Sequence, residues 1–244
     1  MAKMISFGCG VNSVAMAIYL IDKGWKGPIV FADTGGEHPE TYCYLKYFER
    51  EYLQPRGLSV TQISPATHPE LYSRERIREE ITLERYCLSH HCIPLMAVRW
   101  CSVKFKREPL QRWAEANNIG TQLIGIAVDE PRRIREGNYP LVYAGITRKG
   151  CIEIIAKAGL EIPRKSGCFF CPNQRISQWR ELYFDHPELY NRASALEEMA
   201  SEKSGRPVTL TQDYINLRQR AISRNWEGQS RMDFEELKPC ICAI

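Results

Sequence analysis

A cysteine pair in the second half of the chain has a spacing that suits metal or redox chemistry. Cys168 and Cys171 form a C-x-x-C motif in "SGCFFCPN", and the following Pro172 keeps this turn from becoming a helix. Two thiolates three positions apart on a turn can both reach one metal centre, so the motif fits iron–sulfur or zinc ligation. A thioredoxin-like redox pair is the weaker interpretation, because that motif usually opens a helix after a strand.

Other thiols offer further candidates. Cys151 precedes the motif by one helix and a loop that could fold it back toward the pair. A rival zinc site combines the pair with Cys87, His90, His91 and Cys92 of "CLSHHCIP". Cys240 and Cys242, in the terminal "PCICAI", are candidates for a catalytic nucleophile or persulfide carrier, with a functionless chain end as the alternative.

The first glycine-rich loop has the features of a phosphate site. In "ISFGCGVNSVAM" a strand-like run passes into a helix-like one through Gly8, Gly10 and Ser13. A strand-to-helix turn offers free backbone N–H groups and the positive end of a helix dipole, both of which suit phosphate. A tight turn that needs glycine for its dihedrals is the alternative. The loop is neither G-x-G-x-x-G nor a Walker A motif.

Two more positions are expected to face the same ligand. Asp33 ends a strand, where a carboxylate of a parallel sheet faces the crevice, and we expect it to contact Mg²⁺ or nucleotide. Thr34 fits equally a turn that caps a helix. Arg132 follows the strand "LIGIAV" and could clamp phosphate, with a solvated charged surface as the alternative.

The order of elements predicts an α/β fold. Apolar runs indicate strands at residues 3–7, 28–33, 58–64 and 121–128, and helical spacing indicates helices at 11–24, 38–53 and 107–118. The β-α-β-α-β order implies a doubly wound parallel sheet. After about residue 143 helical patterns dominate. We therefore expect a sheet domain at 1–143 and a helical, cysteine-bearing region at 144–244.

Composition limits the class of protein. The 244 residues carry ten cysteines and a mild net charge of +4, which permits but does not demand a polyanionic partner. The N-terminus has no signal-peptide pattern, and no apolar run reaches membrane-spanning length. We expect a cytoplasmic protein without a membrane partner, in which cysteines serve metal or redox chemistry rather than disulfides.

Four segments resemble the phosphoadenosine-phosphosulfate (PAPS) reductase-like family of the ATP pyrophosphatase superfamily. "SFGCGVNS" is similar to its pyrophosphate loop, "FADTGGEHPETYCYL" to its Asp-Thr-Gly segment, and "RWCSVKFKREPLQRW" to its cysteine-bearing segment. "GITRKGCIEIIAKAGLEIPRKSGCFFCP" resembles sulfur-transfer members, including those of DNA phosphorothioation. The resemblance implies the adenine nucleotide alpha-hydrolase-like fold.

The resemblance also implies a set of site residues. The nucleotide would contact Ser6, Phe7, Gly8, Gly10, Asn12, Ser13, Ala32, Thr34, Gly35, Arg132 and Arg148. A [4Fe–4S] cluster would be held by Cys101, Cys151, Cys168 and Cys171, where Cys151 replaces the second member of a Cys-Cys tandem that is Cys101-Ser102 here. Asn12 stands where the family loop has Asp, which weakens a metal-ligand role there. Cys9 replaces a glycine, and is a small turn residue, an activated thiol or a sulfur carrier.

The function implied is an ATP-pyrophosphatase-type sulfurtransferase that uses ATP, Mg²⁺ and the cluster. An acceptor, possibly a nucleic acid, would be adenylated and would then receive sulfur from a partner such as a cysteine desulfurase. The alternative is a reductase of adenylyl sulfate or PAPS that uses a C-terminal cysteine and a thioredoxin-type donor. A further alternative is a non-catalytic nucleotide or nucleic-acid binding module.

Overall fold

The computed structural model describes residues 2–211, 213 and 215–226, and Cys240 and Cys242 lie outside them. Its sheet has the order β3-β2-β1-β4, and all three neighbouring pairs are parallel. The strands are β1 (Ala2–Phe7), β2 (Ile29–Ala32), β3 (Val60–Ile63) and β4 (Ile119–Ile124). The predicted α/β class with a doubly wound parallel sheet is therefore confirmed.

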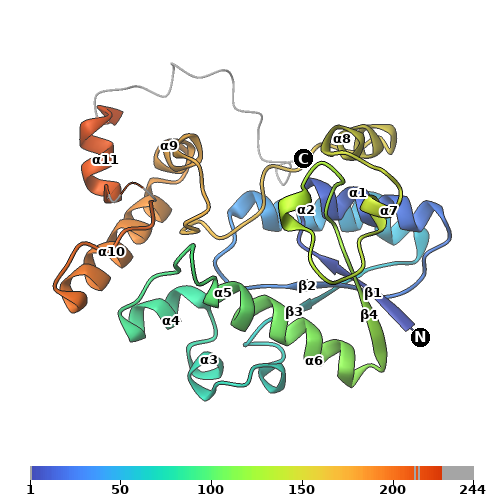
Figure 1. The fold of residues 1–244 in the computed structure, drawn as a ribbon, viewed down its shortest axis with the longest axis horizontal. Helices are drawn as coiled ribbons and strands as arrows, with labels where there is room; N and C mark the ends of the chain where they lie inside the picture. Colours follow the sequence, from blue (N-terminus) through green and yellow to red (C-terminus); the bar gives the residue numbers. More distant parts are fainter. Residues whose placement is uncertain (1, 212, 214, 227–244) are drawn as a thin grey trace.

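Helices cover both faces of this sheet (Figure 1). Because side chains alternate along a strand, Met4 points into one core and Ile5 into the other. The second core is covered by α1 (Val11–Asp22), α2 (Pro39–Phe48) and α8 (Arg148–Lys157), of which α8 packs on α1. The helix α8 therefore belongs to the core of the sheet, although it follows the predicted boundary at residue 143.

The core that contains Met4 extends from the sheet into the C-terminal helices. It is formed by α3 (Glu75–Glu80), α4 (Leu83–His90), α6 (Glu108–Ala116), α9 (Ile176–Asp185), α10 (Pro187–Ser204) and α11 (Leu217–Ser223). Shorter helical segments are α5 (Trp100–Ser102), α7 (Pro140–Tyr143), 3₁₀ turns at 54–56, 69–71 and 131–133, and π turns at 49–53 and 103–107. In the part of the chain that is described, no helix combines the length and apolarity needed to cross a bilayer.

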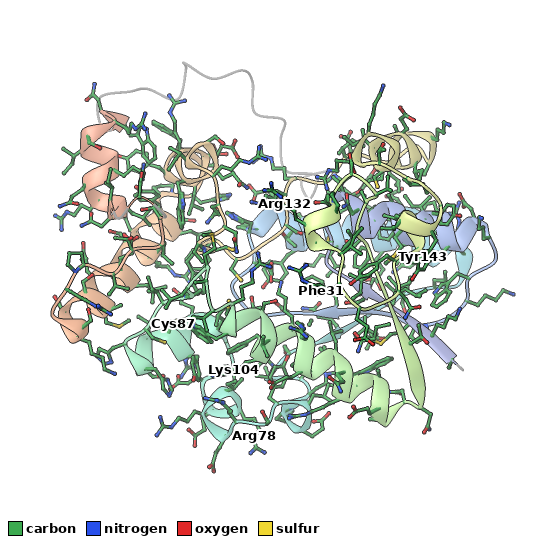
Figure 2. The ribbon with its side chains drawn as sticks, in the orientation of Figure 1. Phe31, Arg78, Cys87, Lys104, Arg132 and Tyr143 are labelled. Atoms are coloured by element: carbon green, nitrogen blue, oxygen red, sulfur yellow. The ribbon has the colours of Figure 1, made fainter. Side chains whose placement is uncertain are left out.

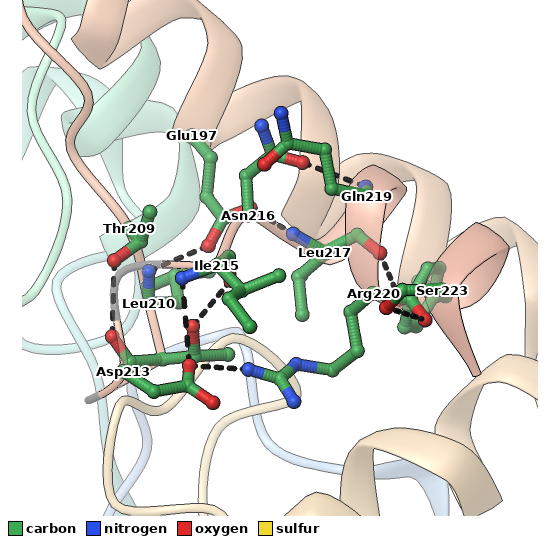
Figure 3. A network of polar contacts seen from close by, with 12 residues as sticks. Glu197, Thr209, Leu210, Asp213, Ile215, Asn216, Leu217, Gln219, Arg220 and Ser223 are labelled. Atoms are coloured by element: carbon green, nitrogen blue, oxygen red, sulfur yellow. Dashed lines mark hydrogen bonds and ion pairs between the residues drawn. The ribbon is translucent and has the colours of Figure 1, made fainter.

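A buried carboxylate ties α11 to α10 (Figure 3). Glu197 of α10 accepts hydrogen bonds from the backbone N–H groups of Leu210 and Leu217, each at 2.6 Å. Arg220 of α11, also buried, pairs with Asp213 in the connecting segment. These contacts fix the short helix, which could not hold its position by local hydrogen bonds alone.

Candidate functional site

The loop between β1 and α1 presents unpaired backbone donors. Within the described residues, the N–H groups of Val11, Asn12 and Ser13 have no hydrogen-bond partner, as expected for the first turn of a helix. The Ser13 hydroxyl accepts from the Gly10 N–H at 3.1 Å and contacts the Gly10 carbonyl at 2.9 Å, which closes the turn. The predicted loop residues therefore form a cradle suited to an anion.

Cys9 within this loop is a packed residue. Its φ of +54° is left-handed and its side chain is buried. The thiol lies 3.5 Å from the carbonyl of Thr41, and burial raises its pKa to about 12. A thiol with such a pKa stays protonated near neutrality, which favours the interpretation of Cys9 as a small turn residue.

Gly125, a position that the sequence analysis missed, lets β4 approach the loop. A Cβ atom at Gly125 would lie 2.8 Å from both the nitrogen and the Cα of Ser13. The available signal was a glycine inside the apolar run "LIGIAV", which marks a close approach of two backbones.

Asn12 links the loop to two distant charged residues. Its Nδ2 donates to Glu130 Oε2 at 2.5 Å, and its Oδ1 accepts from Arg148 Nη1 at 2.7 Å. The structure thus brings the predicted Arg148 to the loop. Glu130 was not predicted. The exposed Arg132 lies on the turn after β4 (Figure 2), and within the described residues its side chain makes no hydrogen bond or ion pair.

Asp33 organises the chain at the end of β2. Its carboxylate accepts hydrogen bonds from the Gly35 N–H (2.8 Å), the Tyr42 hydroxyl (2.7 Å) and Gln62 Nε2 (2.8 Å). Three donors hold this buried group in one orientation. Its predicted contact with Mg²⁺ or nucleotide remains a prediction.

The remaining predicted nucleotide contacts lie at the ends of β1 and β2. Phe7 stacks on Phe48 in the core, with ring centroids 5.5 Å apart, so its side chain is packed away from solvent. Gly35 adopts a φ of +70°, and a Cβ there would meet Thr82 at 2.5 Å. Ser6 and Ala32 lie in the strands themselves.

The C-x-x-C turn lies against the same edge of the sheet. Glu37 and Cys168 form an antiparallel bridge, flanked by bonds from His38 N to Gly167 O (3.0 Å) and from Phe169 N to Gly36 O (2.9 Å). The Cys168 sulfur consequently lies 3.2 Å from Thr34 Oγ1. Residues 34–38, which follow β2, therefore contact the C-x-x-C turn. They connect the edge of the sheet that carries the first loop with Cys168 and Cys171.

An ion pair between a partly exposed lysine and a buried carboxylate lies beside this turn. Lys106 Nζ lies 2.6 Å from Glu37 Oε1, and the Glu37 side chain is 1% exposed. Burial alone would lower the pKa of Lys106, but Glu37 and the neighbouring cysteine sulfurs raise it above its ordinary value. The pKa of Cys168 is raised by burial and by Glu37. The Lys106 ammonium group can therefore offset negative charge on the Glu37 carboxylate and on the Cys168 sulfur.

The structure brings together three of the four predicted cluster ligands. Cys168 is buried in the core that contains Met4, and Cys101 and Cys171 are partly buried and pack against it. Cys171 interacts electrostatically with both Cys101 and Cys168. Cys151 does not join them: it is buried in the core that contains Ile5, where α8 packs on α1. This placement does not fit the predicted role of Cys151 as fourth ligand.

A fourth thiol lies near these three cysteines. Cys87 of α4 (Figure 2) is buried in the core of Cys168 and interacts electrostatically with both Cys101 and Cys168. The backbone N–H of Cys92 donates to the Cys87 carbonyl at 3.0 Å, which holds these two cysteines close together. Among the described residues, no three His, Cys, Asp or Glu side chains lie close enough to hold a single metal ion. Four thiols around one core, with Lys106 beside them, have the donor chemistry that an iron–sulfur cluster requires.

Comparison with known proteins gives a family for the N-terminal part. The sequence model described as "Phosphoadenosine phosphosulfate reductase domain" matches residues 2–139, more than half of the chain. The uncharacterized protein MJ0066 of Methanocaldococcus jannaschii is 24% identical over 225 residues, which cover 82% of this chain and 42% of that protein. The chain thus spans less than half of that relative's length.

Two solved structures are similar to this one. A PAPS reductase from Candida auris, in a phosphate complex, has a TM-score of 0.46 at 16% identity and covers 68% of this chain and 80% of its own. The U34-tRNA thiolase NcsA from Methanococcus maripaludis, with its [4Fe-4S] cluster, has a TM-score of 0.43 at 12% identity and covers 82% of this chain and 72% of its own.

Proposed function

Because the chain belongs to the phosphoadenosine phosphosulfate reductase domain family, we propose that it is an ATP-pyrophosphatase-type sulfurtransferase. The observation that carries this proposal is the location of two sites at one edge of the sheet. The unpaired backbone N–H groups of Val11, Asn12 and Ser13 form an anion cradle after β1. The C-x-x-C turn with Cys168 lies against the segment that follows β2. Ligands of doubly wound sheets bind at this edge.

In the proposed reaction the loop holds the leaving group. An acceptor oxygen attacks the α-phosphorus of ATP, an adenylated acceptor forms, and pyrophosphate leaves with its charge stabilised by the loop N–H groups, Arg148 and Mg²⁺. A sulfide sulfur then attacks the activated acceptor atom, and AMP departs with the former acceptor oxygen. Where the sulfur is delivered as a cysteine persulfide, attack joins the acceptor to that cysteine by a disulfide. A second thiol breaks this disulfide, which leaves the sulfur on the acceptor and joins the two cysteines in a disulfide that a thiol reductant reduces. Asp33, held by three donors, keeps the segment at residues 33–37 in place beside the nucleotide.

The thiols would serve the sulfur side of the reaction. Cys87, Cys101, Cys168 and Cys171 would hold a [4Fe–4S] cluster, with Cys87 in place of Cys151. Because four thiolates would fill the coordination of all four irons, the transferred sulfur could bind such a cluster only after one of these thiols had left its iron. Lys106 would offset part of the negative charge of these thiolates, and the Thr34 hydroxyl would contact Cys168. A nucleic acid is the proposed acceptor, and a cysteine desulfurase the proposed sulfur source.

A reductase is the second candidate, because the matching family is described by PAPS reduction. Here a thiolate attacks the sulfate sulfur of adenylyl sulfate or PAPS, the nucleotide leaves, and a second thiol, regenerated by a thioredoxin-type donor, releases sulfite. Cys240 or Cys242 is the proposed nucleophile.

One experiment separates the two. The anaerobically purified protein is incubated with ATP, Mg²⁺, sulfide and total RNA or DNA, and in parallel with PAPS or adenylyl sulfate and reduced thioredoxin. Release of AMP and pyrophosphate with labelled sulfur in the nucleic acid supports the sulfurtransferase. Release of sulfite supports the reductase. Neither product, in a protein that binds ATP, would contradict both.

A further inference from the structure

The Asn12 side chain lies between two opposite charges. It is 5% exposed, with its amide nitrogen 2.5 Å from a carboxylate oxygen of Glu130 and its carbonyl oxygen 2.7 Å from a guanidinium nitrogen of Arg148. The three residues come from α1, from the turn after β4 and from the first position of α8. They meet only because the fold brings these elements to one end of the loop.

This arrangement fixes the orientation of the amide. A carboxylate near neutral pH can only accept a hydrogen bond, and a guanidinium can only donate one. Asn12 must therefore turn its nitrogen to Glu130 and its oxygen to Arg148. An aspartate at this position would satisfy Arg148 but would place a second carboxylate against Glu130.

Glu130 and Arg148 are each held by further contacts. Glu130 accepts from Arg133 Nη1 at 2.7 Å and from the Ala127 N–H at 3.4 Å. The backbone N–H of Arg148 donates to both carboxylate oxygens of Asp129, at 2.9 and 3.1 Å. Within the described residues, the other N–H groups of the exposed Arg148 guanidinium have no hydrogen-bond partner. These donors are available to an anion at the loop.

We infer that Glu130 is a positioning residue for polyphosphate binding: by orienting the Asn12 amide, it holds the Arg148 guanidinium at the anion cradle. The ligand class is the di- or triphosphate of a nucleotide, or pyrophosphate. This inference rests on the proposed function for the identity of the ligand. Glu130 itself touches no phosphate in this arrangement, because a carboxylate would repel it.

The test compares two neutral replacements of Glu130 by calorimetric titration with ATP and with inorganic pyrophosphate. Glu130→Gln keeps an oxygen that accepts from Asn12, whereas Glu130→Ala removes it. Since both remove the same charge, their difference isolates positioning from electrostatic repulsion. We expect Glu130→Ala to bind up to roughly tenfold more weakly than Glu130→Gln, the upper end of the scale for one hydrogen bond between neutral groups. In an Arg148→Ala background this difference should vanish.

A charge exchange provides a second test. Asn12→Asp alone should weaken binding, because two carboxylates then face each other. Adding Glu130→Gln should restore binding relative to Asn12→Asp. The amide introduced at position 130 can donate to the carboxylate introduced at position 12, and that carboxylate still accepts from Arg148. Glu153→Ala, at an exposed carboxylate on the same helix as Arg148, is the matched control.

The outcomes are distinguishable. Equal affinities of Glu130→Ala and Glu130→Gln, with ATP bound normally by the wild type, would overturn the positioning role and leave the proposed function standing. A wild type that binds neither ATP nor pyrophosphate would overturn both. If circular dichroism shows that Glu130→Ala does not fold, the comparison of Asn12→Asp with Asn12→Asp/Glu130→Gln decides. The inference is overturned if the double variant binds no more tightly than Asn12→Asp.

Discussion

The sulfur of Cys168 lies 3.2 Å from the hydroxyl oxygen of Thr34, although 134 positions separate them in the chain. Thr34 also donates to Glu37 Oε1 at 3.2 Å and accepts from the Gly36 N–H at 3.3 Å. The hydroxyl therefore connects the end of β2 with the C-x-x-C turn. Under the proposed function, chemistry at the thiols and chemistry at the nucleotide would take place in one connected site.

The two candidate fourth ligands of the proposed cluster can be told apart by substitution. We expect Cys87→Ser to lose most of the bound iron and the broad absorbance near 400 nm of the anaerobically purified protein, as should Cys168→Ser. Cys151→Ser should retain both, because Cys151 is buried in the other core. Iron analysis and absorption spectra provide the measurement. Loss of iron from Cys151→Ser with retention in Cys87→Ser would restore the ligand set expected from the sequence.

The ion pair of Lys106 and Glu37 makes a prediction about stability. Lys106→Met leaves the buried Glu37 carboxylate with the Thr34 hydroxyl as a donor but without its cationic partner, so the free energy of unfolding should fall by roughly 1–3 kcal/mol. This loss is smaller than for a fully buried pair, because the Lys106 side chain is 33% exposed. Lys106→Met/Glu37→Gln removes both charges and should regain much of this loss. Urea denaturation of the wild type and the variants measures it.

The control for this pair is Arg50→Met. Arg50 forms an ion pair with Glu51, but both side chains are largely exposed, at 55% and 44%. Its loss should change stability by less than about 1 kcal/mol. A Lys106→Met protein as stable as this control would mean that water reaches the Glu37 carboxylate when Lys106 is removed.

The sheet and the first loop could be predicted from the sequence because their signals are local. Apolar runs of four to six residues, such as "PIVFAD", and the glycines that follow β1 specify strands and a strand-to-helix turn without knowledge of any distant residue. The β-α-β order then restricts the sheet to parallel neighbours.

The partners of Asn12 and the fourth thiol could not be predicted in this way. Asn12 and Glu130 are 118 positions apart, and nothing in either segment specifies that they meet. The sequence favours Cys151 because Ser102 leaves the family's Cys-Cys tandem with one cysteine, and because a helix and a loop could return Cys151 to the C-x-x-C motif. That helix packs on α1, and its buried face carries Cys151 into the other core, on the opposite side of the sheet from Cys87.

The close approach of Gly125 to the loop predicts a specific sensitivity. Gly125→Ala would place a methyl group against the backbone of Ser13 and Asn12, which cannot move aside without reshaping the cradle. We expect the free energy of unfolding to fall by roughly 1–3 kcal/mol. The free energy of ATP binding should lose a larger fraction of its wild-type value than the free energy of unfolding does. Thermal denaturation and calorimetric titration measure the two effects.

Gly8→Ala is the matched control for stability. A Cβ at Gly8 would meet only the Ser13 hydroxyl, at 3.9 Å, an ordinary contact distance. This variant should therefore unfold like the wild type. A Gly125→Ala protein that binds ATP with unchanged affinity would show that the loop backbone is not held by β4 in the way described.

Glu197 predicts how stability depends on pH. Burial raises the pKa of its carboxyl to about 7, and only partly do the N–H groups of Leu217 and Leu210 and the Arg220 guanidinium counteract this. In the unfolded chain the pKa returns to about 4.5, the ordinary value. Between these values the folded protein binds a proton that the unfolded chain has released.

The free energy of unfolding should therefore fall as pH rises from about 4.5 to about 7, and it should level off above that range. The fall is at most about 1.4 kcal/mol for each unit by which the two pKa values differ. Glu197→Gln abolishes the titration, so the difference in unfolding free energy between wild type and variant should change across this range and stay constant above it. Urea denaturation at pH 5, 6, 7 and 8 measures the difference. The comparison uses the pH dependence of the free energy of unfolding. A constant loss of stability, caused by replacing the carboxylate oxygen that accepts from the Leu217 N–H, therefore does not affect the result. Parallel pH profiles of the two proteins would mean that Glu197 is ionised in the folded state throughout, with Arg220 and the two backbone donors outweighing its burial.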